Sequence, residues 1–238
     1  GSEMCIRDRH DHCSPPGAVA DRFRECGYEE TLFQVVPEKD FENPGVDVEF
    51  PDVREFDALV VMGSYWSAWD DEMIGSWLAP EMQLLRDADT AGVPVLGICF
   101  GGQLLARTHG GSVGRAPEPE IGFVEVSSER EDMVPGGKWF AWHYDRWQVP
   151  PDAVEFARND MASQGFVLRK NLAVQFHPEL SSQMLTGWCD NGGREMLASL
   201  GRDADAEIAA AKEWDDEGRR RAGVLVDGFL EQLSLIHI

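Results

Sequence analysis

The feature of this chain that most constrains its fold is a stretch punctuated by glycines, VPVLGICFGGQLLARTHGG, at residues 93–111. The apolar run 93–98 predicts a buried parallel strand, and the residues after it have the apolar spacing of a helix that ends at the final glycine pair. A second apolar run, FDALVVMG at 56–63, also ends at a glycine and predicts another buried strand. Strands that alternate with helices in this way predict an α/β fold, a doubly wound and mostly parallel sheet flanked by helices.

Cys99 stands at the junction between this strand and this helix. A cysteine attacks as the thiolate, and a helix N-terminus favours the thiolate because unpaired N–H groups and the helix dipole stabilise negative charge. Gly97, Gly101 and Gly102 allow a tight turn and a close approach of neighbouring elements, since glycine has no Cβ. The arrangement is the cysteine version of a strand–turn–helix nucleophile elbow. The alternative interpretation is a small buried apolar side chain at a strand end.

A second motif, LAVQFHPEL at 172–180, offers a partner for such a thiolate. His177 ends an apolar segment, and Glu179 follows two residues later. At this spacing the carboxylate can curl back to the imidazole and hold its tautomer, as a catalytic base requires. Taken alone, His177 would more commonly be a surface histidine at a strand end. The two motifs together, each after a buried strand, favour a Cys–His–Glu site.

PVLGICFGGQLLA and VQFHPE together resemble the class I glutamine amidotransferase family, whose glutaminase domains carry a Cys–His–Glu triad. DALVVMGS, EIGF and WHYDRWQVPPDA complete the set in the order of the family, so the resemblance covers about residues 56–190. It implies a flavodoxin-like fold in a single domain, which we assign to residues 10–232.

By this resemblance, Cys99 is the nucleophile, His177 the acid–base and Glu179 the residue that orients the imidazole. Gly63 and the backbone N–H of Phe100 resemble the oxyanion hole. The implied reaction is attack of the thiolate on the side-chain amide carbon of glutamine, loss of ammonia, and hydrolysis of the resulting γ-glutamyl thioester.

The resemblance also implies a set of substrate-binding residues. Gln103, one helical turn after the nucleophile, matches a residue that holds glutamine, and His143 and Tyr144 match a loop whose backbone grips the amino-acid end of the substrate. The sequence departs from the family at the oxyanion strand, where a Gly-Gly-Pro type turn is replaced by VMGSYWSAWDD. Ser64 and Tyr65 therefore stand in an altered pocket wall, and Ser64 is expected among the substrate-binding residues. This departure affects the identity of the substrate more than the class of reaction.

Three functions follow from the resemblance. Family members usually pass ammonia to a synthetase, and because the chain contains no GxxxxGK[ST] loop, the acceptor would be a separate enzyme. The second candidate is a free-standing γ-glutamyl hydrolase or peptidase that acts on γ-glutamyl amides or conjugates by the same thioester chemistry. The third, a non-catalytic binding or regulatory relative, is disfavoured because every expected catalytic side chain is present. No cofactor is predicted.

Composition restricts the partners. The formal net charge of −22 argues against nucleic acid and anionic membranes, since phosphate binding needs a basic face. HDHC at 10–13 has the residue types of a metal site, but adjacent ligands on a short loop rarely close a tetrahedral site, so no metal is predicted. This loop follows the first strand, at the sheet edge where ligands bind, so His10 or His12 is expected to reach the pocket.

The remaining expectations concern location and the ends of the chain. No apolar run approaches the ~20 residues of a membrane span. No secretory signal opens the chain, and scattered cysteines without a CxxC favour a reducing cytoplasm. Residues 1–9 and 233–238 resemble a tag scar and translated adapter sequence, and they are set aside from the functional interpretation. The fold nevertheless requires a first strand, which MCIR would have to supply.

Overall fold

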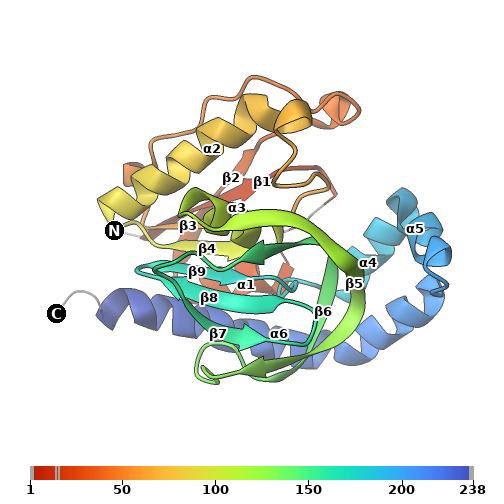
Figure 1. Cartoon of the computed structure of the whole chain (residues 1–238). Helices are drawn as coiled ribbons and strands as arrows, with labels where there is room; N and C mark the ends of the chain where they lie inside the picture. Colours follow the sequence, from red (N-terminus) through yellow and green to blue (C-terminus); the bar gives the residue numbers. More distant parts are fainter. Residues whose placement is uncertain (1–2, 14, 16, 236–238) are drawn as a thin grey trace.

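The computed structural model describes residues 3–13, 15 and 17–235. Its strands form a single sheet in the order β2-β1-β3-β4-β9-β8-β7-β5-β6 (Figure 1). The strands are β1 (Glu3–Arg9), β2 (Tyr28–Gln34), β3 (Ala58–Val61), β4 (Val95–Ile98), β5 (Ser112–Ser128), β6 (Gly137–Gln148), β7 (Val154–Arg158), β8 (Ser163–Leu168) and β9 (Asn171–Val174). The α-helices are α1 (Gly17–Glu25), α2 (Asp71–Ala91), α3 (Phe100–Thr108), α4 (Ser182–Trp188), α5 (Arg194–Ser199) and α6 (Ala204–Leu235).

The parallel half of the sheet is the part that the sequence predicts. Strands β2, β1, β3, β4 and β9 pair in parallel, and β3, β4 and β9 are buried along their whole length. Beyond β9 the sheet continues through β8, β7, β5 and β6, each antiparallel to its neighbour. The doubly wound α/β fold is therefore confirmed, with an antiparallel extension that includes the long β5–β6 hairpin (Figure 1).

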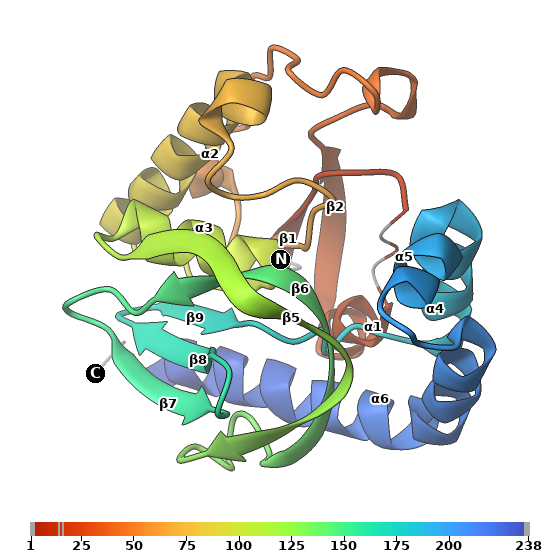
Figure 2. The same ribbon diagram turned by 45° about the vertical axis from the view of Figure 1, so that its right-hand side comes forward.

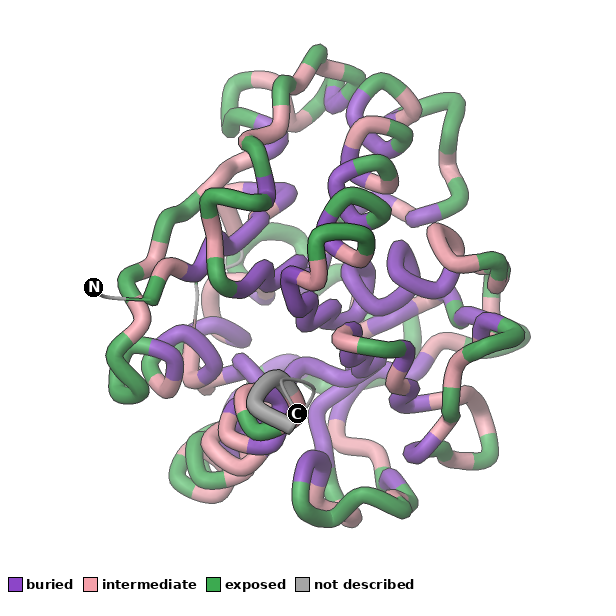
Figure 3. The backbone as a smooth tube through the Cα atoms, turned by 90° about the vertical axis from the view of Figure 1, so that its left-hand side faces the viewer, coloured by how far each residue is buried: buried purple, intermediate pink, exposed green. Residues whose placement is uncertain are grey.

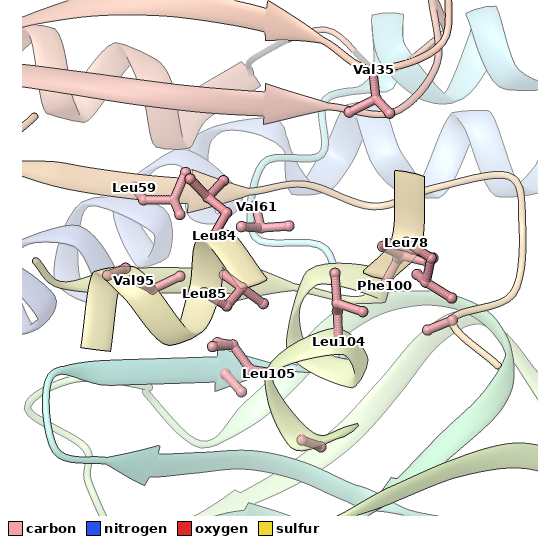
Figure 4. Close-up of a cluster of buried hydrophobic side chains, with 14 of the residues drawn as sticks. Val35, Leu59, Val61, Leu78, Leu84, Leu85, Val95, Phe100, Leu104 and Leu105 are labelled. Carbon is pink, nitrogen blue, oxygen red and sulfur yellow. The ribbon is translucent and has the colours of Figure 1, made fainter. Parts of the chain in front are cut away.

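Helices cover both faces of the sheet. Figures 1 and 2 show α2 and α3 on one face and α1 and the long α6 on the other. The α2–α3 layer buries one set of β3 and β4 side chains (Figure 4), in a cluster that includes Leu59, Val61, Leu78, Leu84, Leu85, Val95, Leu104 and Leu105. The α1–α6 layer buries the alternate set, including Val60, Leu96, Ile98, Val19, Phe23, Leu225, Val226 and Phe229. Figure 3 shows buried central strands, whereas α1, α2 and α6 each have exposed residues on their outer side.

The first strand forms from Glu3–Arg9, part of the segment that resembles a tag scar and translated adapter sequence. In β1, Cys5 and Ile6 are each 2% exposed, and the strand pairs with both β2 and β3. Residues 1–2 and 236–238 lie outside the described residues. Among the helices that the structure describes, none is long and apolar enough to cross a membrane.

Two of the expected helices differ from those observed. The sequence LAPEMQLLRDADTAG at 78–92 by itself predicts a helix with Pro80 in its first turn. The observed helix α2 begins seven residues earlier, at Asp71. The side chain of Asp70 accepts a hydrogen bond from the Met73 N–H and caps the earlier start, which leaves Pro80 inside the helix. The sequence pattern also predicts a single helix over about 181–199. The structure interrupts it at Cys189–Gly193, where Gly192 has a φ of 99°.

The parallel strands all end at the same edge of the sheet, as their shared direction requires. His10 follows β1, Gly63 follows β3 by two residues, Cys99 follows β4 directly, and His177 lies three residues after β9. The chain segments that carry the predicted catalytic residues therefore converge at one place.

Candidate active site

Cys99 occupies a strained turn between β4 and α3. Its φ of 52° and ψ of −104° lie outside the conformations that non-glycine residues ordinarily adopt. Its N–H donates to the carbonyl of Val174 (2.8 Å), which ties the turn to the end of β9. The residue that takes the positive φ is thus the cysteine itself and not one of the neighbouring glycines. The strain points to function, since such conformations cluster at active sites.

The neighbouring glycines serve close approach between elements. A Cβ on Gly97 would lie 2.6 Å from the carbonyl carbon of Gly101, and a Cβ on Gly101 would lie 2.1 Å from the carbonyl oxygen of Val61. No side chain fits at these distances. The absence of Cβ atoms therefore lets the first turn of α3 sit directly against β3 and β4.

His177 is buried between Glu179 and Cys99. Its Nδ1 lies 2.7 Å from Glu179 Oε1, and the side chains are 6% and 2% exposed. Burial opposes the imidazolium, but the charges of Glu179 and Cys99 and their hydrogen bonds to the ring outweigh it and raise the pKa of His177 well above its usual value. Because Glu179 occupies Nδ1, Nε2 remains for proton transfer. The three predicted triad side chains are therefore brought together.

Gly63 and Phe100 lie beside this group. A Cβ on Gly63 would lie 3.1 Å from His177 Cε1 and 3.9 Å from Cys99 Cβ, so the backbone of Gly63 is in close reach of both side chains. Phe100 is the first residue of α3, where backbone N–H groups have no partner within the helix. Both residues are thus positioned next to the sulfur.

A cavity of about 410 Å³ opens in front of Cys99 and His177. Gly63 and Ser64 also line it, and the Ser64 Oγ accepts a hydrogen bond from the N–H of Trp66 (3.2 Å). Four aromatic side chains form much of its wall, namely Phe41, Tyr65, Trp142 and Trp188. None of the described residues that line it is a lysine or an arginine.

The other three predicted substrate-binding residues do not line this cavity. His143 and Tyr144 belong to β6 and not to a loop, which corrects the expectation, although the preceding residue, Trp142, does line the cavity. The His143 side chain is buried between the Asp145 carbonyl (2.8 Å) and Glu120 (2.9 Å). The Gln103 side chain is buried as well, and its amide nitrogen donates to the Asp145 carbonyl (3.1 Å).

The segment 10–13 divides between the cavity and the core. His12 lines the cavity, as expected for one of the two histidines, while His10 is fully buried behind it. His10 groups with Asp8 and Glu81, and one potential ligand atom from each lies within 4.8 Å of the others. This grouping crosses from β1 to α2 and does not involve Cys13.

Sequence reasoning missed one residue at the sulfur itself. Gln175 is fully buried, and its amide nitrogen lies 3.7 Å from Cys99 Sγ while its amide oxygen accepts from Gln103 (3.3 Å). The signal was present, because Gln175 is a polar residue in the apolar run before His177. Trp188, whose ring packs edge-on against His177 at 5.1 Å, carries no comparable signal.

The protein is thus an α/β protein in which a cysteine at a strand-to-helix turn, Cys99, lies beside a buried pair of side chains, His177 and Glu179. The family model described as glutamine amidotransferase class-I matches residues 17–188, and the chain belongs to that family. A crystal structure of a glutamine amidotransferase from Thermotoga maritima superposes with a TM-score of 0.82 at 25% identity, over 98% of each chain.

The names of the curated relatives describe two different activities, that of a peptidase and that of a synthase. The chain is 31% identical to gamma-glutamyl peptidase 5 of Arabidopsis thaliana over 68% of this chain and 66% of that protein. It is 32% identical to the glutamine-hydrolyzing GMP synthase of Vibrio campbellii, over 65% of this chain and 29% of that protein. The chain thus spans two thirds or less of the length of these relatives.

Proposed function

We propose that the protein hydrolyses the amide bond of glutamine or of a related γ-glutamyl compound, with Cys99 as nucleophile, His177 as acid–base and Glu179 as the residue that orients His177. The observation that carries the proposal is the buried His177–Glu179 contact of 2.7 Å beside the strained Cys99, at the base of a cavity. A base that is held by a third group and placed on a nucleophile is the arrangement that acyl transfer needs.

The proposed reaction has two stages, the formation of a γ-glutamyl thioester on Cys99 and its hydrolysis. The Cys99 thiolate forms a bond to the amide carbon, and the carbonyl electrons move to oxygen, where the N–H groups of Gly63 and Phe100 stabilise the charge. The C–N bond then breaks as His177 Nε2–H protonates the amide nitrogen, which leaves as ammonia or an amine, and a γ-glutamyl thioester remains. His177 next takes a proton from water, the hydroxide adds to the thioester, and glutamate leaves as the thiolate re-forms.

In the amidotransferase form of this proposal, a separate acceptor enzyme receives the ammonia. The name of the Vibrio campbellii relative, glutamine-hydrolyzing GMP synthase, supports such coupling. Purified alone, the protein would then hydrolyse glutamine slowly and accelerate when its synthetase is added. Gln103, Ser64, His143 and Tyr144 remain proposed contributors to the binding of glutamine, the two β6 residues through their backbone.

A second candidate is a free-standing γ-glutamyl hydrolase, and the cavity favours it. A volume of about 410 Å³ falls in the range of about 300–1,000 Å³ that encloses drug-sized ligands, which exceeds what glutamine needs. Aromatic walls from Phe41, Tyr65, Trp142 and Trp188 suit an apolar leaving group. The similarity to gamma-glutamyl peptidase 5 points the same way.

One experiment tests the common chemistry and separates the two forms. The purified protein and its Cys99→Ala variant are incubated with L-glutamine and with γ-glutamyl-4-nitroanilide, and glutamate, ammonia and nitroaniline are measured. Cys99→Ala is expected to abolish every release, and equal rates in both proteins would refute the proposal. Fast release from the anilide with slow release from glutamine supports the free-standing hydrolase. The reverse order supports the ammonia donor.

A further inference from the structure

We infer that His10 is a positioning residue for the oxyanion site: it holds the turn at Gly63, packs on Phe100, and is itself held by Glu81 of α2. This inference rests on the proposed function, because it concerns the same two backbone donors. His10 reaches no part of the cavity surface, and its effect on the reaction would pass through Gly63 and Phe100.

The contact with Gly63 determines which ring nitrogen of His10 acts as the hydrogen-bond donor. His10 Nδ1 lies 3.1 Å from the carbonyl oxygen of Gly63. A carbonyl only accepts, so Nδ1 carries the proton and donates. The bond ties the residue after β1 to the turn after β3 and holds the carbonyl of Gly63. The Gly63 N–H belongs to the preceding peptide, Met62–Gly63, so the bond constrains this donor through the position of Gly63. Oxyanion stabilisation depends on donors that are placed before the reaction begins, so a fixed position of Gly63 favours it.

The faces of the same ring contact other parts of the site. Its centre lies 4.4 Å from that of Phe100, the residue that carries the other proposed oxyanion donor, and 5.5 Å from that of Trp77 in α2. His10 is fully buried, so these two rings prevent it from turning away from Gly63. A single imidazole therefore contacts both residues whose N–H groups would face the oxyanion.

Glu81 completes the support from the other side. Its Oε1 lies 2.8 Å from His10 Nε2, and the Glu81 side chain is fully buried on α2. With Nδ1 directed at the Gly63 carbonyl, Nε2 faces Glu81, and a protonated carboxyl of Glu81 is a donor that matches it. Burial raises the pKa of Glu81 to about 8, so that this proton is present at neutral pH. Burial and the nearby Glu81 likewise raise the pKa of Asp8, the third member of the cluster.

The three side chains also have the residue types of a metal site, but the contacts of His10 favour a different use. A metal ion would need a ring nitrogen of His10 as ligand. Here Nδ1 is directed at the Gly63 carbonyl and Nε2 at Glu81 Oε1. A hydrogen-bonded chain from Glu81 through His10 to Gly63 accounts for the cluster without an ion.

The test compares two reactions of Cys99 in the full chain. Hydrolysis of γ-glutamyl-4-nitroanilide passes through an oxyanion, whereas alkylation by iodoacetamide is a direct displacement that forms none. His10→Leu removes the hydrogen bond and keeps an apolar side chain between Trp77 and Phe100. His10→Asn places an amide N–H near the position of Nδ1. His109→Leu, a half-buried histidine at the end of α3, is the matched control.

We expect His10→Leu to lower kcat by about 10- to 100-fold with little change in KM, the size of effect that a misplaced catalytic group produces. Alkylation should keep its wild-type rate, His10→Asn should recover part of kcat, and His109→Leu should behave as wild type. Glu81→Gln should have a kcat close to that of the wild type, and Glu81→Leu should lose kcat to the same extent as His10→Leu. The two Glu81 variants keep the test valid if His10→Leu does not fold.

An unchanged kcat in His10→Leu and Glu81→Leu would overturn the inference, as would an equal loss of hydrolysis and alkylation. Activation of the metal-free protein by added Zn²⁺ or Mn²⁺, lost in Glu81→Gln, would overturn it in favour of a metal site. Cys99→Ala separates the two proposals. If that variant is inactive while His10→Leu is normal, only the inference fails. If it remains active, the proposed function fails.

Discussion

Nδ1 of His177 and Oε1 of Glu179 lie 2.7 Å apart in a site where both side chains are almost completely buried. Glu179→Gln would keep the shape and remove the charge that helps to hold the imidazolium. We expect kcat to fall by up to about four orders of magnitude, the loss seen when the carboxylate of a comparable triad becomes an amide. The pKa of His177 should also fall, which an NMR titration of the ring measures. The exposed Glu195→Gln serves as control, and an unchanged pKa of His177 would contradict the assignment.

Glu81 should make stability depend on pH. Burial raises its pKa from the usual 4.5 to about 8, so the folded protein keeps a proton that the unfolded chain releases. This contribution to stability is fully present below the unfolded pKa and is lost as the pH rises through the folded one. Since Glu81→Gln cannot ionise, its Tm should fall less than that of the wild type between about pH 5 and about pH 8. Parallel Tm curves would show that Glu81 is ionised in the folded state.

The close approach of α3 to β3 should make Gly101 irreplaceable. Its Cβ would lie 2.1 Å from the Val61 carbonyl oxygen, a backbone atom that cannot move aside without shifting the strand. We expect Gly101→Ala to destabilise the fold by at least about 1–3 kcal/mol in urea unfolding. Gly187→Ala in α4 is the matched control, because no atom lies within 4 Å of its Cβ position. The control should be neutral or stabilising by up to about 1 kcal/mol.

Gln175 should assist the sulfur of Cys99. Its amide nitrogen is 3.7 Å from Sγ, and Gln175→Met removes the donor while it keeps the length of the side chain. We expect alkylation of Cys99 by iodoacetamide at neutral pH to slow by about 3- to 10-fold, the value of one ordinary hydrogen bond. An alkylation rate equal to that of the wild type would mean that the contact contributes nothing to the reactivity of the thiolate.

The elements that could be predicted are those whose signal is local. The apolar runs before Gly63 and Cys99, and the spacing of His177 and Glu179, are contiguous patterns, and the structure places β3, β4 and the buried His–Glu pair where those patterns lie. The start of α2 was predicted too late because the cap at Asp70 precedes a polar first turn with no apolar periodicity. The positions of His143 and Tyr144 were misjudged because β6 continues through them.

By itself, the sequence determined the parallel α/β framework and the family, since a strand–cysteine–helix turn and a His–Pro–Glu motif depend on residues adjacent in the chain. Only the tertiary structure decided what surrounds them. Glu81 is one of many acidic residues until α2 packs it against His10, and Gln175 is a strand residue until β9 carries it to Cys99. Phe41, Trp142 and Trp188 form one wall only after distant segments meet. The physical reason is that burial and long-range contact set the protonation of a carboxyl and the shape of a cavity, and neither has a signature in the local order of residues.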